Sequence, residues 1–193
     1  MVDEGGYLVI KEPHGSIGAP LLMEALPESR MILLVRDPRD VVASWLDAVK
    51  QGGWQSERRR EDGQKRDSLA DRNPNAFVRR NADTYLRSVG NAKLAYEEHQ
   101  GHKVLVRYEE LRADTFNTMR RLYATLEIPV DERELARVVE KHSWEEISEE
   151  QKGEGKFYRK ATPGGWREDL TPRQARIVEQ ITAPLLEEFY SAR

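Results

Sequence analysis

The sequence contains no cysteine, has few aromatic residues and lacks any long apolar run. Without thiol groups the chain can form neither disulfides nor thiolate metal sites. No stretch approaches the ~20 apolar residues that a membrane-spanning helix needs, and no signal-peptide pattern is visible. These absences predict a protein without a membrane span, and they fit the reducing environment of the cytoplasm.

The chain also lacks a large excess of charge of one sign. Its 193 residues carry a formal net charge of −3, although 34% of them are charged and only 38% are hydrophobic. This balance argues against a nucleic-acid-binding protein that relies on bulk positive charge. The length suits one domain with its own core, and we find no internal repeat or linker. We therefore expect a single domain over residues 1–193.

The chain is organised around one apolar run and the helix that follows it. Met31–Val35 is typical of a strand that is buried on both faces in a parallel sheet. Asp37 can cap a helix that begins at Pro38, and Asp40 can complete a carboxylate variant of the capping box. Arg36 is then expected at the carboxyl end of a strand, where open α/β sheets bind ligands and helix N-termini favour anions. A capped helix beside a solvated arginine explains the same pattern without a ligand.

Further apolar patterns predict the rest of the fold. Tyr7–Lys11 and Lys103–Val106 are expected to be strands. Apolar residues at helical spacing predict helices over Ala19–Leu26, Pro38–Lys50, Asn75–His99, Asp114–Leu126, Asp131–Lys141, Ser143–Ser148 and Thr171–Tyr190, the last kinked at Pro184. The polar stretch Gly52–Asn73 favours a solvated loop, or else a contact with an anionic acceptor, and Gly153–Asp169 favours a loop. We expect an α/β fold, with a mostly parallel sheet flanked by helices.

Two motifs together resemble those of one enzyme family. The segment Arg36-Asp37-Pro38-Arg39-Asp40, followed by Ser44, resembles the 3′-phosphate-binding strand-loop-helix of the sulfotransferases. These enzymes use 3′-phosphoadenosine-5′-phosphosulfate (PAPS). The late segment KFYRKATPGGW resembles the family loop R-K-G-x-x-G-x-W, which folds over the 3′-phosphate. Arg159 and Lys160 match its two cations, Ala161 stands where the family has glycine, and Trp166 matches the tryptophan as a packing anchor.

The resemblance extends from about Tyr7 to Tyr190 and implies further roles. Lys103–Leu111 resembles the strand and turn whose tyrosine, here Tyr108, lies near the adenine. The fold implied is a three-layer sandwich like that of P-loop nucleotide kinases. The reaction implied is sulfuryl transfer from PAPS to a hydroxyl or amine on a small-molecule, carbohydrate or protein acceptor. The residues implied to bind PAPS or its product, adenosine 3′,5′-bisphosphate, are Arg36, Ser44, Tyr108, Arg159, Lys160 and Ala161.

The implied catalytic residues follow the first predicted strand. Lys11 resembles the family lysine that contacts the transferring sulfuryl group. For the base that accepts the acceptor proton, His14 ranks above Glu12, because a histidine with a pKa near neutrality suits that task. In another branch of the family the base is an upstream glutamate, which would leave the base outside this chain. We predict no metal site.

One family element has no counterpart in the sequence. The glycine- and lysine-containing loop that cradles the 5′-phosphosulfate, of the type P-K-S-G-T, precedes the first strand in the family. Neither Gly5-Gly6 nor the segment after His14 matches it, so the chain is expected to begin after that loop, as an N-terminally truncated fold. The alternative function is therefore a truncated or degenerate member that binds the 3′-phosphoadenosine nucleotide without catalysis. A small phosphate-loop kinase fits less well, because no Walker loop is present.

Overall fold

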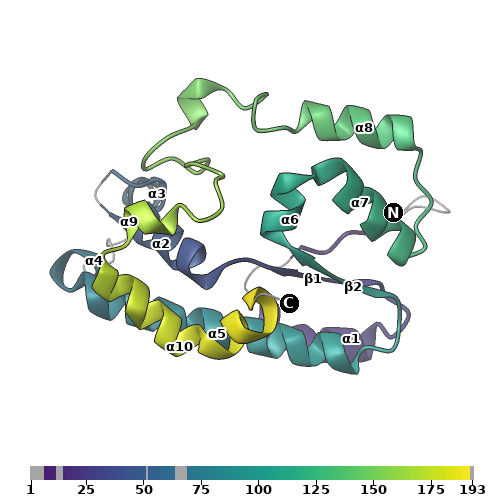
Figure 1. Cartoon of the computed structure of the whole chain (residues 1–193), viewed down its shortest axis with the longest axis horizontal. Helices are drawn as coiled ribbons and strands as arrows, with labels where there is room; N and C mark the ends of the chain where they lie inside the picture. Colours follow the sequence, from purple (N-terminus) through teal and green to yellow (C-terminus); the bar gives the residue numbers. More distant parts are fainter. Residues whose placement is uncertain (1–6, 12–14, 51, 64–68, 192–193) are drawn as a thin grey trace.

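A two-stranded parallel sheet lies at the centre of the computed structural model, which describes residues 7–11, 15–50, 52–63 and 69–191. Strand β1 (Met31–Val35) pairs in register with β2 (Lys103–Arg107). Helices α5 (Pro74–Glu98) and α10 (Pro172–Tyr190) run along one side of the strands, and α6 (Tyr108–Ala113) and α7 (Thr115–Thr125) lie on the other (Figure 1). The fold is α/β with a parallel sheet flanked by helices, as predicted.

Side-chain caps set the starts of most of the longer helices. Asp37, Asn73, Asp114 and Asp131 each accept a hydrogen bond from a backbone N–H of the helix that follows, and Thr171 forms a capping box with Gln174. The remaining described helices are η1 (Gly15–Gly18), α1 (Ala19–Ala25), α2 (Pro38–Val49), α3 (Trp54–Glu61), α4 (Leu69–Arg72), α8 (Glu132–Lys141), η2 (Glu149–Gln151) and α9 (Trp166–Asp169).

The two faces of β1 differ in burial, which corrects the expectation of a strand buried on both faces. Leu33 and Val35 are buried against α5 and α10. Ile32 and Leu34 point to the opposite face and remain 47% and 53% exposed. On that face α7 packs against β2, where Val106 is buried, and leaves β1 uncovered. Continuous apolar sequence therefore did not mean continuous burial.

The prediction of a strand at Tyr7–Lys11 is wrong. This segment forms no regular structure, and Leu8 and Val9 are 73% and 82% exposed. A strand is stabilised by hydrogen bonds to a neighbouring strand. Within the described ranges, β1 and β2 pair with each other and no ladder joins either of them to residues 7–11.

The polar stretch predicted as a loop contains two helices, α3 and α4. Helix α3 begins at Trp54, whose ring packs edge-on against Phe157 at a centroid distance of 5.3 Å. The residues after Trp54 are mostly good helix formers, and α3 also packs against α2. The contact between Trp54 and Phe157 therefore stabilises α3, although the sequence of this helix shows almost no apolar periodicity.

The predicted short helix Ser143–Ser148 does not form. The Ser143 N–H instead donates to the carbonyl of Glu140 in the turn that follows α8, which ends at Lys141. The chain then passes through turns, since a single isolated turn is too short to repay helix nucleation. The predicted kink in the last helix is confirmed: Thr182, two residues before Pro184, has non-helical dihedral angles. No helix in the described ranges combines the length and apolar character that a membrane span requires.

Candidate functional site

Arg36 lies at the carboxyl end of β1 and its guanidinium faces an aromatic ring. The guanidinium carbon is 4.4 Å from the centroid of the Tyr108 ring, a cation–π contact. Tyr108 begins α6 directly after β2, and the strands are parallel, so both residues stand at the same edge of the sheet. The buried Nε of Arg36 has no hydrogen-bond partner among the described residues. This cation therefore retains a free donor.

Buried tyrosines hold the backbone around Arg36. The Tyr85 hydroxyl donates to the Arg36 carbonyl at 2.7 Å and accepts from the Arg36 N–H at 3.2 Å. Burial raises the pKa of Tyr85 to about 12. Glu109 accepts one hydrogen bond from the Asp37 N–H and another from the Tyr190 hydroxyl, whose pKa is raised mainly by burial. These contacts tie the strand end to α5, α6 and α10.

The late loop, residues 152–165, lies along α2 and is bound there by two carboxylates. Asp40 is 1% exposed and accepts hydrogen bonds from the N–H groups of Gly164 (2.7 Å) and Trp166 (2.9 Å). Asp47 accepts one from Gly155 at 3.2 Å. The predicted capping-box role of Asp40 is therefore wrong: Asp37 already caps α2, and the Asp40 oxygens bind amides far along the chain.

Ser44 lies between these two carboxylates on α2. Residues four apart, and then three apart, share one helix face, so Ser44 is on the face that the late loop covers. Its side chain is partly buried. Ser44 therefore lies on the same face of α2 as the two carboxylates that bind the late loop.

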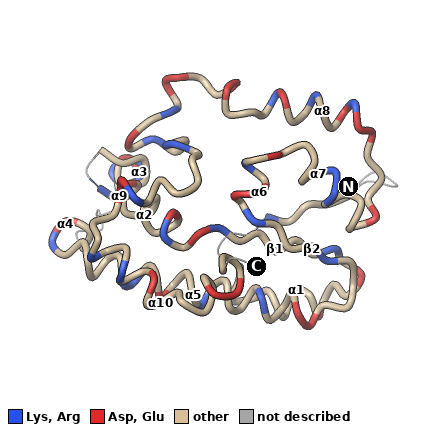
Figure 2. The backbone as a smooth tube through the Cα atoms, in the orientation of Figure 1, with Lys and Arg blue, Asp and Glu red and all other residues tan. Residues whose placement is uncertain are grey.

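The two cations of the late loop are already paired with carboxylates. Arg159 Nη1 lies 2.6 Å from an Asp169 oxygen, and its Nε lies 3.9 Å from Asp47. Lys160 lies 2.8 Å from Glu168 and 3.0 Å from Asp169, and these hydrogen bonds raise its pKa. Figure 2 shows acidic and basic positions close together around α9. A bound anion would have to share these cations with the carboxylates or displace them.

A cavity of about 300 Å³ opens between α2, α9 and the late loop. Its charged lining contains four acidic and three basic side chains: Asp47, Glu154, Glu168, Asp169, Lys50, Arg159 and Lys160. Such a mixed lining holds cations in place while nearly cancelling their charge. Arg36 is not among the residues that line this cavity, and it differs from the lining cations in keeping a free donor.

Ala161 adopts a backbone conformation that favours glycine. Its φ is +49°, in the left-handed region that a Cβ atom disfavours by about 1–2 kcal/mol. Ala161, which stands where the family motif has glycine, therefore has a backbone conformation more typical of glycine than of alanine. Arg112 of α6 donates from Nε to the Ala161 carbonyl at 3.2 Å.

Trp166 anchors the end of the late loop, as its place in the motif predicts. Its ring packs against the main core cluster and lies between two guanidinium groups, those of Arg39 (4.4 Å) and Arg167 (4.5 Å). Arg39 also pairs with Asp37 at 2.7 Å and Glu179 at 3.0 Å, and the hydrogen bond to Asp37 raises its pKa. The tryptophan thereby joins α2, α9 and α10.

The structure describes one of the three predicted catalytic residues, Lys11. Lys11 ends the exposed segment 7–11, and no described residue forms a hydrogen bond or ion pair with its side chain. Glu12 and His14 lie outside the described residues. Their roles stay predictions.

Four residues that hold the late loop have no site role in the sequence-based prediction. They are Asp40, for which the sequence predicts only a helix cap, Asp47, Arg112 and Asp169. The spacing of Asp40, Ser44 and Asp47 places three polar groups on one face of a helix whose other residues are apolar except Arg39, and this signal could have found the two acids. For Arg112 and Asp169 the sequence holds no comparable signal, because their partners are set by the path of the loop.

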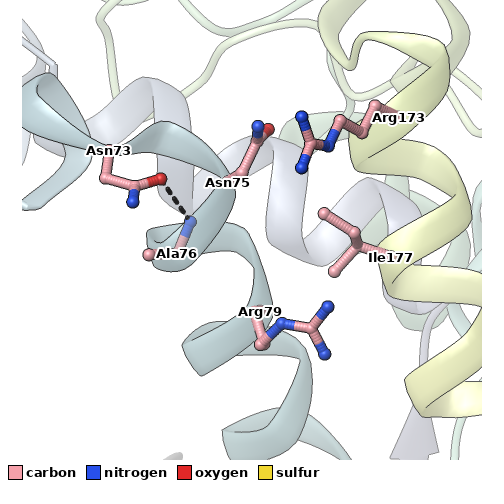
Figure 3. Close-up of a pocket in the computed structure, with 6 residues that line it drawn as sticks. All are labelled: Asn73, Asn75, Ala76, Arg79, Arg173 and Ile177. Carbon is pink, nitrogen blue, oxygen red and sulfur yellow. Dashed lines mark hydrogen bonds between the residues drawn. The ribbon is translucent and has the colours of Figure 1, made fainter.

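A second cavity, of about 430 Å³, lies between the N-terminal parts of α5 and α10 (Figure 3). Arg79 and Arg173 extend from the two helices on either side of Ile177. No described residue forms an ion pair with either arginine. The cavity shares no lining residue with the one beside the late loop.

Comparison with known proteins identifies a matching family and similar solved structures. The family described as Sulfotransferase domain matches residues 10–190. A solved structure described as mouse sulfotransferase SULT7A1 complexed with PAP has a TM-score of 0.58 and 18% sequence identity to this chain. The alignment covers 88% of this chain and 62% of the mouse chain, so this chain spans less than two thirds of its length. No curated protein sequence matches.

Proposed function

Because the chain belongs to the Sulfotransferase domain family, we propose that it transfers the sulfuryl group of PAPS to a hydroxyl or amine acceptor. PAPS would supply the activated sulfuryl group. The chain would bind and orient the nucleotide and would place the acceptor for in-line attack. The acceptor class is a small molecule, a carbohydrate or a protein, and the proposed location remains the cytoplasm.

The observation that supports the proposal best is the environment of the Arg36 guanidinium. Its guanidinium stacks on Tyr108 at the carboxyl end of the sheet, and its buried Nε has no partner among the described residues. A buried donor without a partner costs free energy, which an anion accepting from it would recover. An arginine can bind a phosphate through two parallel hydrogen bonds. The site therefore suits the 3′-phosphate of the nucleotide, with the Tyr108 ring available to the adenine side.

The other contacts with the nucleotide are proposed from the two sequence motifs. Ser44 would offer its hydroxyl, while Arg159 and Lys160 would approach from the late loop once an anion shares them with Asp47, Asp169 and Glu168. Lys11 is proposed to contact the transferring group. His14, or else Glu12, is proposed to accept the acceptor proton.

Nucleotide binding is the first test. Calorimetric titration of the chain with adenosine 3′,5′-bisphosphate should show selective binding over 5′-ADP, which lacks the 3′-phosphate. Arg36→Ala should weaken bisphosphate binding by about tenfold to a hundredfold, because a charged hydrogen-bonded contact is lost. Arg133→Ala, on the exposed side of α8, is the matched control and should leave the affinity unchanged.

The second test is transfer of labelled sulfate from PAPS to a panel of phenol, aliphatic alcohol, amine and oligosaccharide acceptors. Transfer to any acceptor, lost in Arg36→Ala, supports the proposal. Selective nucleotide binding without transfer to any acceptor would identify the chain as a nucleotide binder only. Equal binding of the bisphosphate and 5′-ADP would contradict the role given to Arg36.

A further inference from the structure

Arg112 makes the hydrogen bond that joins α6 to the late loop within the described residues. Its Nε donates to the Ala161 carbonyl at 3.2 Å, across 49 positions in the chain. Other contacts of the loop lead to α2 through Asp40 and Asp47, and to α9 through the ion pairs of Arg159 and Lys160. The loop also contacts α3, where the Trp54 N–H donates to the Gly155 carbonyl at 2.7 Å.

The hydrogen bond between Arg112 and Ala161 connects α6, which carries Tyr108, with the late loop. Arg112 follows Tyr108 by four residues, so the two side chains stand on the same face of α6. Tyr108 contacts Arg36 and Arg112 contacts the loop that carries Arg159 and Lys160. Helix α6 therefore sets the position of both the aromatic ring and one end of the basic segment.

The residue that Arg112 holds has a disfavoured backbone conformation. Ala161 has a φ of +49°, and its conformation persists only where surrounding contacts hold it. Helix α6 contacts Ala161 at its carbonyl group, through the Nε of Arg112. A donor placed against it opposes relaxation of the backbone to a more common geometry, which would turn the carbonyl away and displace Lys160 beside it.

We propose that Arg112 is a positioning residue, which holds the Ala161 turn against α6 and so preforms the basic part of the nucleotide site before ligand arrives. The consequence for ligand affinity rests on the proposed function, whereas the effect on the ligand-free loop does not. Preforming the loop reduces the ordering cost of binding. Arg112 itself need not contact the nucleotide.

A matched pair of substitutions separates the hydrogen bond from the charge. In Arg112→Gln the amide nitrogen occupies the same position along the side chain as the arginine Nε, so the donor is kept and the charge is lost. In Arg112→Met a methyl group stands at that position, so both are lost. Any difference between the two variants therefore reports the hydrogen bond. Arg133→Gln, which removes a charge from exposed α8, controls for charge at a distance.

Hydrogen exchange of the ligand-free protein is the first measurement. We expect faster amide exchange across residues 161–166 in Arg112→Met than in Arg112→Gln, with unchanged exchange in the core of α5. Unchanged α5 exchange shows that the fold is intact. Equal exchange in the two variants across the loop would overturn the proposal, whether or not the chain binds a nucleotide.

Titration with adenosine 3′,5′-bisphosphate is the second measurement. Arg112→Met should bind about five- to tenfold more weakly than Arg112→Gln, which is the usual range for one hydrogen bond. Equal affinities of the two variants, both below that of the unmodified chain, would mean that only the charge of Arg112 acts and would overturn the positioning role. If the unmodified chain binds no bisphosphate, the proposed function fails, and the exchange experiment still decides the role of Arg112.

Discussion

The carboxylate of Asp40 lies 2.7 Å from the backbone nitrogen of Gly164, a residue 124 positions later in the chain. Its other oxygen accepts from the Trp166 N–H at 2.9 Å. One buried side chain in the first turn of α2 thus satisfies two amides of the segment that ends the late loop. Any anion bound at Arg36 would lie close to the start of this same helix.

Asp40→Ala should destabilise the protein by about 3 kcal/mol, because two buried amides lose a charged acceptor. Urea unfolding measured by circular dichroism gives this change in the free energy of unfolding. Asp83→Ala, an exposed carboxylate on α5, should change it by less than about 0.5 kcal/mol. Equal effects of the two substitutions would contradict the structural role of Asp40.

Ala161→Gly should stabilise the protein by about 1 kcal/mol. Glycine tolerates a φ of +49° without the clash of a Cβ atom, although the added freedom of the unfolded chain offsets part of the gain. Ala136→Gly in α8 is the opposite case, since right-handed helical backbone favours alanine by about 1 kcal/mol. Thermal unfolding should therefore shift upward for the first variant and downward for the second; a downward shift in both would exclude strain at residue 161.

Neighbouring leucines of β1 should differ sharply in their tolerance of substitution. Leu33 is 4% exposed and packs against α5 and α10, so Leu33→Ala should lower the free energy of unfolding by about 2–5 kcal/mol. Leu34 is 53% exposed, and Leu34→Ala should cost less than about 1 kcal/mol. Denaturant midpoints of the two variants provide the comparison, and similar midpoints would argue that both faces of β1 are covered.

Stability should fall at high pH through Tyr85. The pKa of its hydroxyl is raised from 10.0 to about 12 by burial, so between these values the folded state holds a proton that the unfolded state has lost. Tyr85 should thus make its full contribution to the free energy of unfolding below pH 10. That free energy should decline by about 2–3 kcal/mol as the pH approaches 12.

Urea unfolding at several pH values from 9 to 11.5 measures this decline. Tyr85→Phe removes the titrating group, so its stability should start lower, because the hydrogen bonds with Arg36 are lost, and should then fall less steeply with pH. Tyr190, whose pKa is raised as well, adds a decline of the same sign in both proteins. Parallel curves for the two proteins would show that Tyr85 does not cause the slope.

Local patterns predicted most of the secondary structure. The start of α2 at Asp37-Pro38, the start of α10 at Thr171-Pro172 and the kink near Pro184 depend on groups within a few residues of one another, so the sequence shows both partners together. Failures occurred where an element depends on distant neighbours. Segment 7–11 has an apolar strand pattern but pairs with no strand in the described part of the chain. Helix α3 has almost no apolar pattern yet packs through Trp54.

The candidate site also has features that the local sequence predicts and features that depend on distant neighbours. The residue types in the motif at Arg36 and in the late loop were sufficient to indicate the family and the residues expected to bind the nucleotide. Only the tertiary structure decided that Asp40 binds the late loop instead of completing a cap, that the loop cations already have acidic partners, and that Arg112 reaches Ala161. A motif records which groups are present along the chain, whereas charge pairing and hydrogen bonding between α2, α6 and the loop depend on distances that exist only after the chain has folded.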